Sequence, residues 1–177
     1  TELTEKQTEY VDIINLSGVS LLGIINDILD FSKIESGQIE LEEINFNLNE
    51  KIQEIYKMMN LKAQEKNLKL SFHVDEAIPP YLVGDPLRLK QIIINLVNNA
   101  IKFTDAGSVT LEANLLSNDS ENVRVFFKIV DTGIGIPEKA KKKLFKEFSQ
   151  ADASISRKHG GSGLGLSISK NLAKIMG

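Results

Sequence analysis

Three polar side chains in one predicted helix have the types and the spacing to bind a metal ion and a phosphate. Asn95, Asn99 and Lys102 follow one another at i, i+4 and i+7, so a helix places them on one face. Amide oxygens can ligate a hard cation, and a lysine ammonium can pair with a phosphate. The alternative explanation is a polar face that is merely exposed to solvent.

A carboxylate at the end of a predicted strand is the second candidate. Alternate residues of segment 123–131 are apolar and share one face, and Asp131 continues that face into a Gly-x-Gly turn at Gly133 and Gly135. A carboxylate in such a place needs hydrogen-bond donors. The edge of an amino-purine could supply one, and the glycines would let a ring approach the backbone. An ordinary aspartate before a glycine turn is the alternative.

The third candidate is a glycine-rich segment, residues 159–166, that leads directly into a predicted helix. Glycines before a helix N-terminus expose backbone amides that suit phosphate oxygens. The segment is not a Walker loop, because no Lys-Ser or Lys-Thr follows Gly165, and it does not follow a strand with dinucleotide-fold spacing. A flexible linker would look similar, so this motif alone is a weak indication.

The helix that carries the first candidate is predicted over residues 86–102. Apolar residues surround most of its circumference, and its polar residues form one narrow wedge, which indicates a helix facing a cavity. The wedge consists of Arg88, Gln91, Asn95, Asn98, Asn99 and Lys102.

A long helix is predicted at the start of the chain, from a capping box at Thr4 to Gln7 to a stop at Ser36 and Gly37. Its apolar seam, spaced alternately by three and four residues, is typical of a helical bundle and needs a partner. The seam runs through Val11, Ile14, Gly18, Leu21, Ile25, Ile28 and Ser32. The remaining expected elements are strands 44–48, 68–74, 108–116 and 123–131, and helices 49–66, 138–147 and 166–176, which together predict an α+β sandwich.

Composition excludes several classes of protein. The 177 residues are 42% hydrophobic and 25% charged, which rules out general disorder, and they contain no cysteine for disulfides or thiolate zinc sites. The formal charge of −3 argues against nucleic acid as a partner, and the lysines at 139 and 141–143 are flanked by Glu138 and Glu147. No apolar run approaches the roughly 18 residues of a membrane span, and no signal peptide is evident.

Four motifs in order closely resemble the N, first glycine, F and second glycine boxes of sensor histidine kinases. They are Asn-Leu-x-x-Asn-Ala-x-Lys-Phe-Thr (95–104), Asp-x-Gly-x-Gly-Ile-Pro (131–137), Leu-Phe-x-x-Phe-x-Gln-x-Asp (144–152) and Gly-Gly-Ser-Gly-Leu-Gly-Leu (160–166). The resemblance covers essentially the whole chain and is strongest to hybrid sensor kinases. Residues 21–42 resemble the second helix of the dimerisation and phosphoacceptor bundle.

The resemblance implies a Bergerat-type α/β sandwich, with a mixed sheet covered on one face by helices. It implies part of the bundle at residues 1–40, without the acceptor histidine, and an ATP-binding catalytic domain at 41–177 that lacks its last strands. Asn99 would be the Mg²⁺ ligand supported by Asn95, Lys102 would contact phosphate, and Asp131 would bind the adenine amine beside Gly133 and Gly135. Residues 145–159 would form an ATP lid; the remaining nucleotide-binding residues would be Phe148, Arg157, Lys158, Gly161, Ser162, Gly163, Leu164, Gly165 and Leu166.

The resemblance has two departures. The chain has no His-Glu-x-x-x-Pro-like acceptor box, since its two histidines are His73 and His159, and it stops where the family continues into further strands. We therefore expect a fragment of a larger kinase, with no catalytic acceptor in this chain. The implied partners are a second copy through the N-terminal helix, the parent's phosphoacceptor helix and a response regulator receiver domain. The implied location is a cytoplasmic domain, with membrane anchoring of the parent left open.

Two other functions are compatible with a nucleotide-binding fold of this kind. Gyrase-type and mismatch-repair-type ATPases place a glutamate, which orients water, four residues before the magnesium asparagine. Here that position is Asn95, so phosphoryl transfer to a protein histidine is favoured over hydrolysis. A nucleotide-binding regulatory module without kinase activity stays open.

Overall fold

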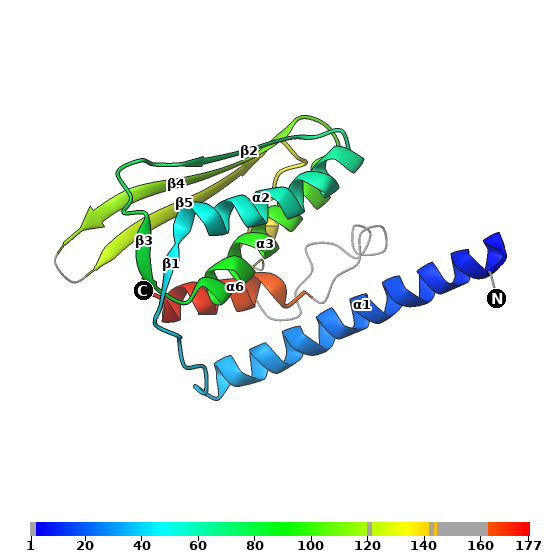
Figure 1. Cartoon of the computed structure of the whole chain (residues 1–177), viewed down its shortest axis with the longest axis horizontal. Helices are drawn as coiled ribbons and strands as arrows, with labels where there is room; N and C mark the ends of the chain where they lie inside the picture. The colour runs from blue at the N-terminus through cyan, green and yellow to red at the C-terminus, as the bar shows by residue number, and fades with distance from the viewer. Residues whose placement is uncertain (1–2, 120–121, 142–143, 145–162) are drawn as a thin grey trace.

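The computed structural model describes residues 3–119, 122–141, 144 and 163–177, arranged as Figure 1 shows. The expected α+β architecture is confirmed. In chain order the elements are α1 (Glu5–Glu35), β1 (Ile44–Asn47), α2 (Leu48–Glu65), β2 (Lys69–Val74), β3 (Tyr81–Gly84), α3 (Pro86–Phe103), β4 (Ser108–Asn118), β5 (Val123–Asp131), α4 (Glu138–Lys141) and α6 (Gly165–Ile175). The helix expected over 138–147 is described only as far as α4.

The main sheet is mixed and has the order β2-β4-β5, with β2 parallel to β4 and β4 antiparallel to β5. Helices α2 and α3 cover one face of it (Figure 1). Alternation along β4 explains this, because Val109, Leu111 and Ala113 are buried whereas the residues between them are not. Strands β1 and β3 form a separate antiparallel pair rather than extending the sheet.

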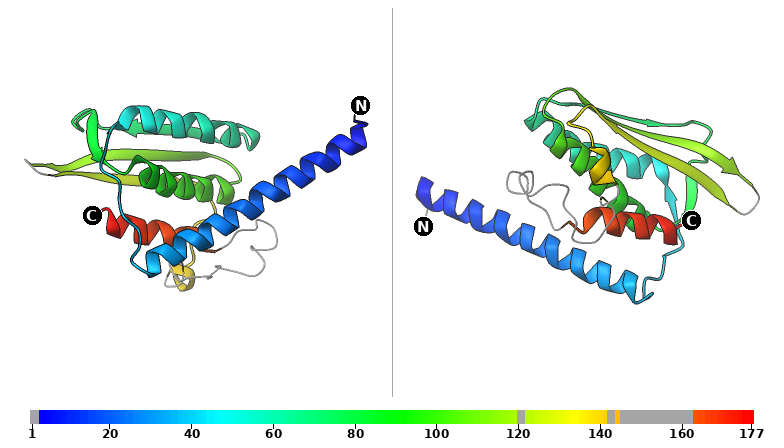
Figure 2. Two further views of the ribbon diagram at one scale, coloured as in Figure 1. Left: turned by 60° about the horizontal axis from the view of Figure 1, so that its bottom comes forward. Right: turned by 180° about the vertical axis from the view of Figure 1, so that it is seen from behind.

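Helix α1 begins and ends where the sequence predicts. The Thr4 hydroxyl accepts a hydrogen bond from the backbone N–H of Gln7, and Oε1 of Gln7 accepts one from the backbone N–H of Thr4. These two bonds complete the capping box. The helix stops at Ser36, followed by Gly37 at φ 64°. Its C-terminal half lies beside α6, while its N-terminal end projects away from the sheet (Figure 2).

The apolar residues of α1 are largely exposed. Val11, Ile14, Leu21, Ile25 and Ile28 are between 41% and 67% exposed. Within the described residues, α1 is also the single helix long and apolar enough to cross a membrane, with a window of mean hydropathy 1.4. This corrects the expectation that nothing approaches a membrane span: polar residues interrupt the apolar ones, but few of them are charged.

A small apolar cluster joins α6 to α1 and α3. Leu164, Ile168 and Leu172 are buried, and Phe31 and Ile34 of α1 and Ile92 of α3 pack against them. Helix α6 therefore lies between the other two helices, which brings the segment after Gly163 alongside the polar residues of α3 (Figures 1 and 2).

Candidate functional site

Helix α3 is anchored at both ends. Asp85 is 4% exposed and caps the N-terminus, where Oδ1 accepts from the Arg88 amide at 2.9 Å, and Pro86 opens the first turn. At the other end Nζ of Lys66 donates to the carbonyl oxygens of Ile101, Lys102 and Thr104 at 2.9 to 3.0 Å. A cation suits these carbonyls, because the helix C-terminus carries partial negative charge.

The polar wedge of α3 does not face a single cavity, which corrects the sequence prediction. Arg88 and Gln91 both bind Asp30 of α1, and Asn98 accepts from Nζ of Lys62 on α2 at 3.1 Å. The reason is that α3 has several neighbours, and successive turns of one polar face contact different ones.

Asn95 and Asn99 lie together on α3, and Asn95 contacts α6. Nδ2 of Asn95 donates to Oγ of Ser169 at 2.7 Å, and Nδ2 of Asn99 donates to Oδ1 of Asn95 at 3.4 Å. Gly165 is part of the same contact, because a Cβ atom there would lie 2.4 Å from Oδ1 of Asn95. A glycine at 165 thus allows the start of α6 to approach the asparagines.

The N-terminus of α6 has features of an anion-binding helix start. Gly163 has φ 72°, Leu164 is buried as the N-cap residue, and among the described residues no side chain caps the helix. Leu164 and Leu166 thus flank Gly165 where the first turn passes the asparagines. Backbone amides at such a start can bind phosphate oxygens.

Asp131 ends β5 and its side chain is exposed. Its Oδ1 accepts from the Gly133 amide at 2.9 Å. The turn that follows is joined to α3, because Ile134 donates to the carbonyl of Phe103 at 3.2 Å and a Cβ on Gly133 would lie 2.4 Å from that carbonyl oxygen. Asp131 and the C-terminal end of α3 are therefore held next to each other, and Gly135 continues the turn at φ 68°.

Lys102 is half-buried at this end of α3. Burial lowers the pKa of its ammonium below the ordinary value, because desolvation penalises the charged form. Its Nζ lies 5.0 Å from the centre of the Phe103 ring. A phosphate bound beside Lys102 would stabilise its charged ammonium and so offset the effect of burial.

Some predicted site residues lie outside the described residues. They are Phe148, Arg157, Lys158, Gly161 and Ser162, together with His159 and the expected lid. Of the residues with described positions, the structure brings Asn95, Asn99 and Gly165 into contact, and it holds Asp131 and Gly133 next to Phe103, the neighbour of Lys102.

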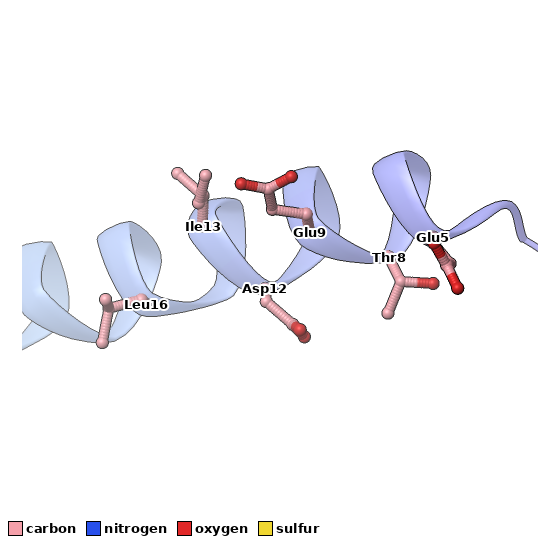
Figure 3. A pocket seen from close by; sticks show the side chains of 6 residues that line it. All are labelled: Glu5, Thr8, Glu9, Asp12, Ile13 and Leu16. Atoms are coloured by element: carbon pink, nitrogen blue, oxygen red, sulfur yellow. The ribbon is translucent and has the colours of Figure 1, made fainter.

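A hollow of about 530 Å³ lies elsewhere, along the N-terminal half of α1 (Figure 3). Its lining comes from one helix and includes the acidic residues Glu5, Glu9 and Asp12. None of these belongs to the candidate motifs, and a single helix surface does not enclose a ligand. We therefore place the functional site at α3 and α6.

The sequence analysis missed Ser169, Lys66 and Asp30. Ser169 could have been found, because it follows Gly165 by four residues and so lies on the same face of α6. Lys66 and Asp30 gave no such signal, since their partners are 35 to 61 residues away. In the part of the chain that the structure describes, no group of three or more His, Cys, Asp or Glu residues could hold a metal.

Comparison with known proteins identifies the arrangement. Residues 84–177 match the family model described as histidine kinase-, DNA gyrase B- and HSP90-like ATPase, and residues 1–37 match the His Kinase A phospho-acceptor domain. The chain belongs to the histidine kinase-, DNA gyrase B- and HSP90-like ATPase family. Within this family, the match to the phospho-acceptor domain and the relatives described below are typical of sensor histidine kinases. The resemblance seen in the sequence is therefore confirmed.

Individual relatives support the histidine kinase assignment. The chain is 48% identical over 179 residues to the signal transduction histidine-protein kinase BarA of Escherichia coli, and 49% identical over 177 residues to the sensor histidine kinase GacS of Pseudomonas protegens. Each comparison covers 100% of this chain but 19% of the relative. Among solved structures, full-length ShkA in complex with AMPPNP matches with a TM-score of 0.81 and 34% identity, over 99% of this chain and 35% of that one.

Proposed function

We propose that this chain is the ATP-binding catalytic core of a two-component sensor histidine kinase. It would transfer the γ-phosphate of ATP to a histidine that lies outside these 177 residues. The observation that carries the proposal is the contact of Asn95 with the start of α6, next to Asn99 and beside a turn that joins Asp131 to the end of α3. This arrangement joins a candidate base-binding carboxylate to a candidate phosphate site.

Each residue has a role that fits its surroundings. Asp131 would accept a hydrogen bond from the adenine amine through the carboxylate oxygen that Gly133 does not engage. Lys102 would pair with phosphate, and the backbone after Gly163 would receive phosphate oxygens at the start of α6. Gly133 and Gly135 would leave room for the purine ring.

Magnesium suits the donor set of α3. Because Nδ2 of Asn99 is directed toward Asn95, its Oδ1 is the atom left to ligate a hard cation. Bound with ATP, Mg²⁺ would neutralise charge on the phosphates, and the chain itself would orient the nucleotide against the acceptor. Positioning of this kind supplies most of the catalysis in phosphoryl transfer.

Hydrolysis is a less suitable function for this site. A gyrase-type ATPase needs a glutamate where this chain has Asn95, and the amide of Asn95 cannot accept a proton from water. Its two polar atoms also contact Ser169 and Asn99. A regulatory module that binds nucleotide without transferring phosphate is the other outcome that the experiments below distinguish.

The proposal extends to assembly and location. We propose residues 1–40 as part of the bundle and 41–177 as the catalytic domain. The exposed seam of α1 supports a homodimer with a second copy, and the acceptor helix of the parent and a receiver domain would be further partners. The chain spans about a fifth of BarA and GacS. We propose a cytoplasmic location for the catalytic part of the parent kinase, whether or not a membrane anchors that parent.

Nucleotide binding tests this proposal. Calorimetric titration of the wild type should show tighter binding of Mg²⁺-ADP than of Mg²⁺-IDP, because inosine lacks the exocyclic amine. Asp131→Asn should lose about tenfold in ADP affinity and most of that preference, since the amide presents a donor as well as an acceptor. Glu112→Gln, which alters an exposed carboxylate paired with Lys128 on the sheet, is the matched control and should bind like the wild type. Equal ADP affinity in the wild type and Asp131→Asn would refute the adenine assignment.

A further inference from the structure

Ser169 lies at the contact between α6 and α3 and belongs to none of the four motifs. It is 5% exposed, and its Oγ accepts a hydrogen bond from Nδ2 of Asn95 at 2.7 Å. This bond is short and shielded from water, so it holds the Asn95 side chain in place against α6.

The orientation of Asn95 determines that of Asn99. With the nitrogen of Asn95 directed toward Ser169, its oxygen faces Asn99 and accepts from Nδ2 of that residue at 3.4 Å. If the Asn95 amide were reversed, its NH₂ group would face Asn99, and Asn99 would have to turn its own oxygen inward to accept. The oxygen that can ligate a cation would then be withdrawn from the site.

Gly165 reinforces this arrangement from the same helix. It precedes Ser169 by one turn and leaves room for Oδ1 of Asn95, while Ser169 bonds the nitrogen of the same side chain. Helix α6 therefore bonds the amide at its nitrogen and packs closely beside its oxygen. The neighbouring buried serine, Ser167, has a different partner, since its Oγ donates to the carbonyl of Leu164 at 2.8 Å.

We propose that Ser169 is a positioning residue for the magnesium ligand Asn99 and acts on it through Asn95. The proposal rests on the proposed function, because it concerns the same site. It predicts that Ser169 affects the magnesium dependence of nucleotide binding more than it affects the fold.

The test measures ADP affinity by calorimetry at a series of Mg²⁺ concentrations and in EDTA. Ser169→Ala should raise the Mg²⁺ concentration for half-maximal enhancement about fivefold, as expected when one buried hydrogen bond is lost, and leave the affinity in EDTA unchanged. Ser167→Ala is the matched control, since it removes a hydroxyl of similar burial from the same helix. It should show the wild-type magnesium dependence, while thermal melting reports any loss of stability in each variant.

A double-mutant cycle tests the route through Asn95. In an Asn95→Ala background, Ser169→Ala should have no further effect on the magnesium requirement. Two results would overturn the role of Ser169 and leave the proposed function standing. One is an equal effect of Ser169→Ala in the wild-type and the Asn95→Ala backgrounds. The other is a wild-type magnesium requirement in the Ser169→Ala single variant. A wild-type chain whose ADP affinity ignores Mg²⁺ would overturn both.

Discussion

Arg88 of α3 donates a hydrogen bond from Nη1 to Oδ1 of Asp30 on α1, at 3.0 Å. Gln91 donates to the other oxygen of Asp30 at 2.7 Å and accepts from Arg88 at 2.9 Å. The side chains of the ion pair are about one-fifth exposed. Together with the apolar cluster around α6, these bonds join α1 to α3 and α6.

The first prediction concerns this ion pair. Asp30→Ala leaves the charge of Arg88 partly buried without its partner, so the free energy of unfolding should fall by about 1 to 3 kcal/mol. Glu54→Ala is the control, because Glu54 pairs with Lys51 and Lys90 at the protein surface, and it should leave the free energy of unfolding close to that of the wild type. Urea unfolding followed by circular dichroism measures both variants. Equal losses would show that the Asp30 contact adds nothing to the joining of α1.

The second prediction concerns the close approach at Gly165. In Gly165→Ala the new Cβ would meet Oδ1 of Asn95, which can move aside because it ends a side chain. We therefore expect a folded protein with at least about a tenfold loss in Mg²⁺-ADP affinity by calorimetry. Gly23→Ala in α1 is the control, since nothing lies within 4 Å of its Cβ position. That change should gain stability by up to about 1 kcal/mol without altering binding. Unchanged ADP affinity in Gly165→Ala would contradict the site geometry.

The third prediction is a pH dependence at Lys102. Binding a phosphate favours the charged ammonium of Lys102. Nucleotide affinity should therefore be highest at pH values below the pKa that Lys102 has in the nucleotide-free protein, and it should fall as the pH rises through that pKa. Because burial lowers that pKa from 10.5, the decline should begin at a lower pH than for an ordinary lysine. Lys102→Arg should remove the decline, since arginine stays charged throughout. Lys174→Arg, an exposed change on α6, is the control and should keep it. A wild-type affinity that stays constant up to pH 10.5, the ordinary pKa of a lysine, would exclude Lys102 from phosphate binding.

Local patterns predicted the elements that carry the site. The capping box at Thr4, the Asp85 and Pro86 helix start, and the alternation in β4 and β5 are all short-range signals, and each structural boundary lies within about two residues of its expected position. Each glycine motif alone could be an ordinary turn or linker. Their order along the chain indicates the histidine kinase family, and the match of residues 84–177 to the family model confirms that assignment.

Long-range neighbours could not be predicted in the same way. A helical projection groups Arg88, Gln91 and Asn98 with Asn95 and Asn99 but does not show which element covers each turn. The structure assigns the first two to α1 and Asn98 to α2. Ser169 was missed for a related reason: its role depends on a contact with Asn95, 74 residues earlier in the chain.

The fourth prediction concerns the exposed seam of α1. A continuous exposed apolar seam favours association, so the wild type should form a dimer in sedimentation experiments. Ile25→Asp and Ile28→Asp place a charge in the seam and should shift the chain to monomer. Leu61→Asp is the control, because Leu61 is 65% exposed on α2, outside the seam. A wild type that stays monomeric at all accessible concentrations, or Leu61→Asp acting like the seam variants, would contradict a dimer through α1.

The central claim is that this chain delivers the γ-phosphate of ATP to a histidine outside itself. The direct test incubates the full 177-residue chain with γ-labelled ATP and Mg²⁺, with and without a bundle fragment that carries an acceptor histidine. We expect acid-labile label on the added fragment, none on this chain alone, and clearly reduced transfer by Asp131→Asn at ATP concentrations below saturation. Acid-labile label on this chain without the fragment would show that His73 or His159 is an acceptor. Release of inorganic phosphate would indicate a hydrolase, and ADP binding without any transfer would indicate a regulatory module; each of these results would contradict the account.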